Sequence, residues 1–252
     1  MRILAVDTAT STASVALIED GTLVAQHPSD RQGPPAGSSR KGNHSEIILP
    51  LIESSLREAQ FDICDISLFA ISIGPGSFTG LRIGLSTLKG LAYGGGAPVV
   101  GVSTLLANAA RVTNYNGLIC SILNARKSEV YTAVFRKDGD RLFRMTEDSA
   151  GSAAAMGKMM AALDGVNPCL FVGDGAIVYR DLIREFFGSR AKLSAGNEYP
   201  SVAFAVARLS MGRSAEGSAI GELVPKYLRA PECEMKVGSV MQLVEMPSIM
   251  SR

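Results

Sequence analysis

The sequence predicts an α/β protein built from two lobes, each a mixed sheet flanked by helices. Apolar residues make up 46% of the 252 positions, which is enough for a large buried core. Short strand-like runs alternate with longer helical patterns along the chain. The strand pattern that opens the chain starts again near residue 118, which indicates a duplication. Two α/β lobes account for all three observations.

The first half opens with apolar runs that predict a strand meander over residues 3–7, 13–18 and 22–27. Asp20-Gly21 separates the last two runs, and Asp-Gly between strands favours a hairpin turn. The stretch 28–43 is rich in Pro, Gly and Ser, so we expect an exposed loop. The remaining pattern predicts a helix over 45–60, a strand over 66–73, a glycine-rich turn over 74–80, a helix over 81–93 and a strand over 98–102.

The second half repeats this opening. A strand over 118–123 ends at Asn124, and strands over 129–135 and 141–145 follow, again joined by Asp-Gly. Helices are predicted over 152–163, 177–187 and 202–211, with a strand over 169–172. We therefore assign residues 1–112 to the first lobe and 113–252 to the second. The C-terminal segment 216–252 is expected to pack back on the first lobe.

Charge and hydropathy exclude several classes of protein. Lys and Arg total 25 against 24 for Asp and Glu, a formal net charge of +1. A chain that holds nucleic acid by itself normally has a clearly basic face, so this balance argues against direct binding of nucleic acid and leaves open that RNA is reached through a partner. Asp7 interrupts the first apolar stretch, and no apolar run approaches the roughly 18 residues of a membrane span. We expect a cytoplasmic protein that does not enter the membrane.

Common catalytic motifs are absent from the sequence. His27 and His44 are the only histidines, so no H-E-x-x-H pair can hold a metal on one helix face, and we expect no metal site. Neither G-x-S-x-G nor G-x-x-x-x-G-K-[ST] occurs, which excludes the usual nucleophile elbow and the usual P-loop. The sequence therefore gives no direct evidence of a catalytic residue.

One segment could hold an anion. The loop from Gly74 to Gly80 joins a predicted strand to a helix, where free backbone N–H groups can bind phosphate. Asp7 and Thr8 follow the first strand and could orient a metal-bound phosphate. Glycine-rich turns of this shape also serve as tight connections, and no glycine accompanies Asp7 for a close phosphate approach. Both interpretations stay open from the residues alone.

Six segments in chain order resemble the bacterial TsaB family, also called YeaZ. They are Asp7-Thr8-Ala9-Thr10, His44-Ser45-Glu46 with the following Leu49-Pro50-Leu51-Ile52, the run from Gly74 to Gly84, Asn124 to Tyr131, Gly173-Asp174-Gly175-Ala176, and Pro225-Lys226-Tyr227-Leu228-Arg229. The run GPGSFTGLRIG at residue 74 is the most specific of them. The resemblance implies the fold of the actin-like ATPase (ribonuclease H-like) superfamily.

The resemblance also implies a role in making threonylcarbamoyladenosine beside the anticodon of tRNA. In this family the paralogue TsaD binds the metal and transfers the threonylcarbamoyl group, together with the ATPase TsaE, and TsaB is a noncatalytic partner. The family thus predicts that this chain is not an enzyme by itself and requires no cofactor, while ATP and a divalent metal are bound by partner subunits. It also predicts a homodimer when the chain is isolated.

Two sets of site residues follow from this resemblance. A vestigial nucleotide cleft would contain Asp7, Thr8, Gly74, Gly76, Ser77, Thr79, Asn124, Gly173, Asp174 and Gly175. Asn124 stands where the family usually has Asp, which weakens any case for nucleotide chemistry in the second lobe.

The family forms dimers through helices of its first lobe. A partner interface would contain Ile48, Ile52, Leu56, Leu81, Leu85, Leu88 and Ala92. Each of these apolar residues could instead cover the chain's own sheet. Gly84 and Gly90 would let a partner helix approach closely.

An enzyme is the rival class of function. An autonomous ATPase or small-molecule kinase would use Asp7, the Gly74 loop and Gly173-Asp174-Gly175. A peptidase is disfavoured because the chain has only two histidines.

Overall fold

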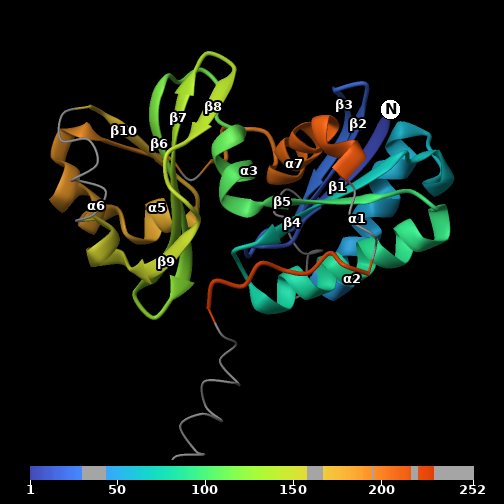
Figure 1. The fold of residues 1–252 in the computed structure, drawn as a ribbon, viewed down its shortest axis with the longest axis horizontal. Helices are drawn as coiled ribbons and strands as arrows, with labels where there is room; N and C mark the ends of the chain where they lie inside the picture. The colour runs from blue at the N-terminus through green and yellow to red at the C-terminus, as the bar shows by residue number, and fades with distance from the viewer. Residues whose placement is uncertain (30–43, 158–166, 195, 217–220, 230–252) are drawn as a thin grey trace, which may run out of the picture.

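The computed structural model describes residues 1–29, 44–157, 167–194, 196–216 and 221–229, and it shows two α/β lobes side by side (Figure 1). Residues 30–43 of the predicted loop, the end of the predicted helix over 152–163 and most of the C-terminal segment lie outside these residues. Pro28, which was expected in the loop, ends a strand instead. Within the described part of the chain, none of the helices combines the length and the apolar character that crossing a bilayer requires.

A five-stranded sheet forms the centre of the first lobe, in the order β3-β2-β1-β4-β5. Strands β1, β2 and β3 form the predicted antiparallel meander, and β4 and β5 extend the sheet in parallel with β1. The bounds are β1 Arg2–Asp7, β2 Ser14–Glu19, β3 Thr22–Pro28, β4 Leu68–Gly74 and β5 Val99–Ser103. Because β1 and β4 are buried on both faces, they read as continuous apolar runs.

The sheet of the second lobe repeats this plan strand for strand. Its order is β8-β7-β6-β10-β11, with the same antiparallel and parallel pairs as the first sheet, and β9 pairs additionally with β7. The bounds are β6 Gly117–Arg126, β7 Glu129–Asp138, β8 Arg141–Arg144, β9 Ser149–Ser152, β10 Cys169–Val172 and β11 Ala191–Ser194. The predicted fold class, two duplicated α/β lobes, is confirmed.

Helices cover both faces of the first sheet. Leu4 and Val6 on one face pack with α1 (His44–Ala59) and α2 (Phe78–Gly95). Ile3 and Ala5 on the other face pack with α7 (Val202–Ser210) and with Ala107 of α3 (Thr104–Ala110). This alternation follows from the two-residue period of a strand.

The second sheet shares one of these helices with the first. One face packs with α5 (Asp174–Val178) and α6 (Arg180–Phe187). The other face packs with Leu105 and Ala109 of α3, which lies between the lobes (Figure 1). The short helix α3 and the strand β11 were not predicted from the sequence, and Ser103 caps α3 through the Leu106 N–H.

Two helices thus cross between the lobes. Helix α3 follows β5 of the first sheet and packs on the second, and α7 follows β11 of the second sheet and packs on the first. The Ser14 hydroxyl of β2 accepts a hydrogen bond from Ala203 N at the start of α7. The boundary placed at residue 112 assigned 202–210 to the second lobe, whereas these residues complete the core of the first.

Candidate functional site

The loop between β4 and α2 lies directly on the end of β1. The Thr8 hydroxyl donates a hydrogen bond of 2.8 Å to Gly80 O, and Ser77 N donates one of 2.7 Å to Ala9 O. A Cβ at Gly76 would overlap Ala9 O, one at Gly80 would overlap Thr8 O, and one at Gly84 would overlap the Thr8 hydroxyl. The glycines therefore allow the loop and α2 to approach β1 closely.

The second lobe repeats this arrangement. Gly173 follows β10 as Gly74 ends β4, and both have a positive φ, 109° and 115° respectively. A Cβ at Gly173 would overlap Ile122 O of β6, and one at Gly175 would lie 2.9 Å from the same oxygen. In both lobes the glycines bring the chain against its own backbone.

Asn124 and Asp174 form the polar end of this second loop. Asn124 N donates a hydrogen bond of 3.0 Å to Asp174 Oδ1, and the Tyr179 hydroxyl donates one of 3.2 Å to Asn124 Oδ1. The structure thus brings Asn124, Gly173, Asp174 and Gly175 together through contacts within the second lobe.

Asp7 is the carboxylate that sequence analysis placed at the centre of the site. It is 1% exposed at the end of β1, and Ala9 N donates a hydrogen bond of 3.3 Å to its Oδ1. Burial raises the pKa of Asp7, an effect that the Ser72 hydroxyl, the Ala9 N–H and the charge of Arg111 only partly offset. A raised pKa favours the protonated carboxyl, which is a poor ligand for a cation.

The predicted cleft residues differ in exposure. Ser77, Thr79 and Asp174 are exposed, Gly76 and Asn124 are half-buried, and Asp7, Thr8, Gly74, Gly173 and Gly175 are buried. Among the described residues, no group of three or more His, Cys, Asp or Glu side chains is placed to hold a metal ion.

The predicted interface residues lie in the core of the first lobe. Leu81, Leu88 and Ala92 are at most 1% exposed, Ile48, Ile52 and Leu85 are at most 6% exposed, and Leu56 is half-buried. All but Leu81 pack in the core cluster that includes residues of β1, β2 and β4, so they cover the chain's own sheet, and only the half-buried Leu56 keeps much of its side chain accessible. Gly84 also faces inward, onto Thr8, whereas Gly90 faces open space. This corrects the prediction at the level of individual residues.

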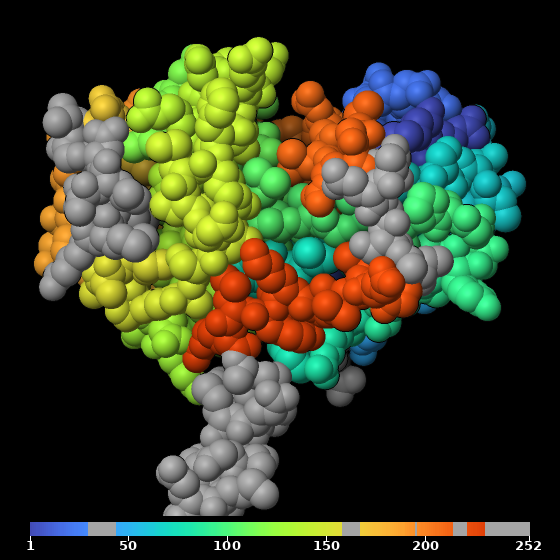
Figure 2. Space-filling model, viewed as in Figure 1, coloured from blue at the N-terminus to red at the C-terminus, as the bar shows by residue number. Residues whose placement is uncertain are grey.

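A segment near the C-terminus, residues 221–229, crosses both lobes, and we call it the strap. It runs over the front of the molecule from the first lobe to the second (Figure 2, red). Lys226 N donates a hydrogen bond of 2.7 Å to Ile73 O, and Leu223 joins the core beneath α1 and α2. Arg229 reaches the second lobe, where it lies 2.6 Å from the Glu129 carboxylate. The expected return of this segment to the first lobe is seen for these residues.

Aromatic residues hold the strap on α2. The rings of Phe78 and Tyr227 are 4.6 Å apart, and the Arg82 guanidinium lies 3.9 Å from the centre of the Phe78 ring. Arg82 Nε donates a hydrogen bond of 3.0 Å to the Tyr227 hydroxyl. Sequence reasoning gave these side chains no role, although Tyr227 lies in a segment that carried the resemblance.

Asp148 joins the strap to both lobes. Its side chain is fully buried and accepts hydrogen bonds from the Ser103 hydroxyl at the end of β5, from Arg144 and from Lys226, at 2.8, 2.7 and 3.3 Å. Burial alone would raise the pKa of Asp148, but these hydrogen bonds and positive charges lower it overall. The carboxylate is therefore ionised at neutral pH and holds three segments together.

Comparison with known proteins places this architecture in a family. The family model described as "TsaD: tRNA N6-adenosine threonylcarbamoyltransferase" matches residues 35–236. The tRNA threonylcarbamoyladenosine biosynthesis protein TsaB of Bacillus subtilis is 31% identical over 240 residues, which cover 94% of this chain and 97% of that protein. The chain belongs to the TsaB (YeaZ) family.

Further comparisons agree with this TsaB-family assignment. TsaB of Escherichia coli is 38% identical over 60% of this chain and 62% of that protein. The solved structure of YeaZ from Pseudomonas aeruginosa superimposes with a TM-score of 0.68 at 24% identity, over 90% of this chain and 99% of that chain. Another structure from that organism, described as similar to the peptidase YEAZ, gives 0.70 at 23% identity over the same shares. At these identities the two structures show the shared fold.

Proposed function

We propose that this TsaB-family chain is a noncatalytic subunit that supports a TsaD-like transferase, with a TsaE-like ATPase, in transferring the threonylcarbamoyl group to tRNA. In this proposal the partner subunits bind ATP and the divalent metal, the complex rather than this chain reaches the tRNA adenosine, and the assembly is cytoplasmic. The family assignment supports the pathway, and the structure of the two glycine loops supports the noncatalytic role.

The observation that carries the proposal is the close contact of both glycine loops with the chain's own strands. Phosphate binding at such a loop needs backbone N–H groups that are free to meet an anion. Here Ser77 N is engaged by Ala9 O, and Gly80 N by the Ser77 hydroxyl at 3.2 Å. The glycines face Thr8, Ala9 and Ile122 rather than open space. This arrangement favours a structural use of the loops over nucleotide chemistry.

The exposed sides of α1 and α2 are the surface that we propose for the partner. Leu49 of α1 is 52% exposed and Tyr93 of α2 is 83% exposed. Gly90 and Gly94, one helical turn apart, have no neighbouring atom within 4 Å of a Cβ, so a partner helix could approach α2 closely. A second copy of the chain would use the same surface when the transferase is absent. These residues replace the buried stripe that sequence analysis selected.

Co-purification tests this surface. The double variant Leu49→Glu and Tyr93→Glu should lose capture of the TsaD-like transferase and the modification of tRNA, because charges would be buried at the interface. Phe143→Glu is the matched control, since Phe143 is 47% exposed on β8 of the other lobe. Capture and tRNA modification that persist in the double variant would overturn the surface assignment.

A nucleotide titration tests the noncatalytic role. The isolated chain should neither bind ATP tightly with magnesium nor hydrolyse it, and the same assay on the complex is the positive control. Turnover of ATP, or of a small-molecule phosphate acceptor, by the isolated chain would favour the autonomous ATPase or kinase. Hydrolysis of peptides by the isolated chain would favour a peptidase. Either result would overturn the proposal.

A further inference from the structure

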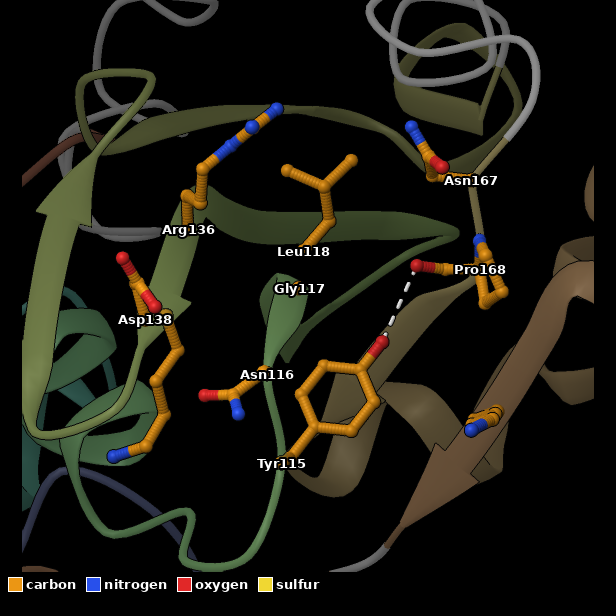
Figure 3. A pocket seen from close by; sticks show the side chains of 10 residues that line it. Tyr115, Asn116, Gly117, Leu118, Arg136, Asp138, Asn167 and Pro168 are labelled. Carbon is orange, nitrogen blue, oxygen red and sulfur yellow. Dashed lines mark hydrogen bonds between the residues drawn. The ribbon is translucent and has the colours of Figure 1, made fainter.

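A pocket of about 480 Å³ opens in the second lobe, away from both glycine loops. Figure 3 shows that its wall includes the start of β6, the end of β7 and the residues before β10. Strands β6 and β10 are parallel, and the pocket lies where they begin, at Leu118 and Pro168. Asn124 and Gly173 lie toward their other ends. The pocket therefore lies at the opposite end of these strands from the candidate functional site.

The charged residues that line this pocket are mostly cations. Arg136 and Lys137 of β7 and Lys192 of β11 line it, against the single carboxylate of Asp138. In the part of the chain that the structure describes, none of these three cations forms an ion pair with a carboxylate. Because the whole chain has a formal charge of only +1, this is a local concentration of positive charge. Such a site attracts anions from solution.

An aromatic ring and a carboxamide stand among these cations. The Tyr115 hydroxyl donates a hydrogen bond of 3.2 Å to Pro168 O. Lys192 Nζ lies 5.5 Å from the centre of the Tyr115 ring. The side chain of Asn116 is held by Gly139 N, which donates to its Oδ1 at 2.9 Å. Proteins that bind single-stranded nucleic acids combine aromatic rings with adjacent cations. The ring stacks on a base and the cations contact phosphate.

We propose that this pocket binds a nucleotide unit of an RNA strand, with the phosphodiester held by Lys137 and Lys192 and the base against Tyr115. These three residues lie on the sheet face of Leu142 and Leu170, whereas Arg136 lies on the other face with Leu118. The size fits, because pockets for small ligands are typically about 300–1,000 Å³. The choice of RNA rests on the proposed function in tRNA modification. The pocket gives the chain a direct RNA contact on the lobe that does not carry α1 and α2, so the partner surface stays available. This differs from the expectation that RNA is reached only through the partner.

Fluorescence anisotropy on the full chain tests the proposal. The probe is a short labelled single-stranded RNA, titrated at several salt concentrations. The double variant Lys137→Gln and Lys192→Gln should bind about tenfold more weakly, and the slope of log affinity against log salt should fall by roughly 0.7 for each phosphate that the variant no longer neutralises. The matched control, Arg184→Gln with Arg208→Gln, removes two exposed cations that lie outside the pocket and outside α1 and α2, and it should bind like the wild type.

Three results would overturn the proposal. The wild type could fail to bind the RNA at low salt, or the pocket variant and the control could bind equally weakly, which indicates nonspecific attraction. Adenosine monophosphate could compete as well as unlabelled RNA, which would assign the pocket to a free nucleotide instead. Capture of the transferase is measured on the same variants and should not change. Failure of the wild type to capture the transferase would defeat the proposed function while leaving the RNA result to stand.

Discussion

Gly80 and Gly90 lie in the same helix but have opposite surroundings. A Cβ at Gly80 would overlap Thr8 O and lie 2.9 Å from His44 Nδ1, whereas one at Gly90 meets nothing within 4 Å. The helical period alone does not separate the two positions, because the distinction depends on how closely α2 approaches β1. Spacing could therefore predict the helix but not the purpose of each glycine in it.

Alanine substitution should separate these two glycines. Gly80→Ala should lower the free energy of unfolding by about 1–3 kcal/mol, because the methyl group is forced against backbone. Gly90→Ala should raise it by roughly 0.5–1 kcal/mol, because alanine loses less conformational entropy in a helix. Urea denaturation with a common slope measures both changes. Equal effects of the two substitutions would contradict the close packing of α2 on Thr8.

The buried carboxyl of Asp7 should make stability depend on pH. Because burial raises its pKa in the folded chain, the folded state retains a proton that the unfolded state releases at its lower, ordinary pKa. The contribution of Asp7 to stability is thus fully present below that ordinary value and is lost as pH rises through the folded pKa. Asn cannot ionise, so Asp7→Asn should gain stability relative to the wild type as pH rises above the ordinary carboxyl pKa of about 4.

Urea denaturation of both proteins across this pH range measures the difference. Other carboxyl groups titrate in both chains, so their effects cancel in the comparison. A difference that stays constant with pH would mean that the pKa of Asp7 is the same in the folded and unfolded states.

At the scale of elements, the strap depends on a few side chains at the start of α2. Tyr227 contacts the Phe78 ring and accepts a hydrogen bond from Arg82. The backbone N–H of the neighbouring Lys226 donates a hydrogen bond to Ile73 O, and its side chain forms an ion pair with Asp148. Val224 of the same segment is 65% exposed. The strap is therefore fixed to the first lobe at particular points, and the Tyr227 ring is one of them.

Tyr227→Ala should loosen the strap without unfolding the lobes. Amide hydrogen exchange over residues 221–229 should become faster, by about tenfold for a decrease of roughly 1.4 kcal/mol in local stability, because the ring stacking and the hydrogen bond are both removed. Val224→Ala is the control and should leave exchange unchanged. Rapid exchange across β1 and β4 in Tyr227→Ala would contradict a local role for the ring.

Helices and strands with a strong sequence pattern could be predicted, and those with a weak pattern could not. The meander follows from its apolar runs and from Asp20-Gly21, and α1 and α2 follow from helical spacing. Helix α3 has seven residues and none of them is exposed, because it lies between two sheets, so its sequence lacks the amphipathic period of a surface helix. Its one local signal is Ser103 as a cap. The strap has no periodic pattern, since it is held by individual contacts.

The candidate site shows the same limit. Sequence reasoning found the residues that gather at the strand ends, among them Asp7, Thr8, Gly74 and Gly173. It did not show that the loops fill this space themselves, because that depends on distances between segments far apart in the chain. It selected Leu85 and Leu88 as interface residues because a sheet face and a partner both require an apolar stripe. Only the positions of α1 and α2 in the fold show that this stripe packs on the chain's own sheet.

At the scale of the whole molecule, the crossing helices should make the two lobes depend on each other. A fragment of residues 1–112 lacks α7, so the face with Ile3, Ala5 and Leu68 would be exposed to water. We expect this fragment to be aggregated or loosely packed, and the full chain to unfold in a single transition. Near-ultraviolet circular dichroism and size-exclusion chromatography measure this. A monomeric, well-packed fragment 1–112 would contradict the dependence.

The return of α7 also has a consequence for synthesis on the ribosome. Chains emerge N-terminus first at about 5–20 residues per second, and a domain completes its core only when all of its parts have emerged. Here the first sheet is translated early, but α7, the helix that covers its face with Ile3 and Ala5, ends only at Ser210. The nascent chain therefore carries an apolar sheet face while the whole second sheet is being made, and a chaperone that shields such surfaces should raise the yield of folded protein.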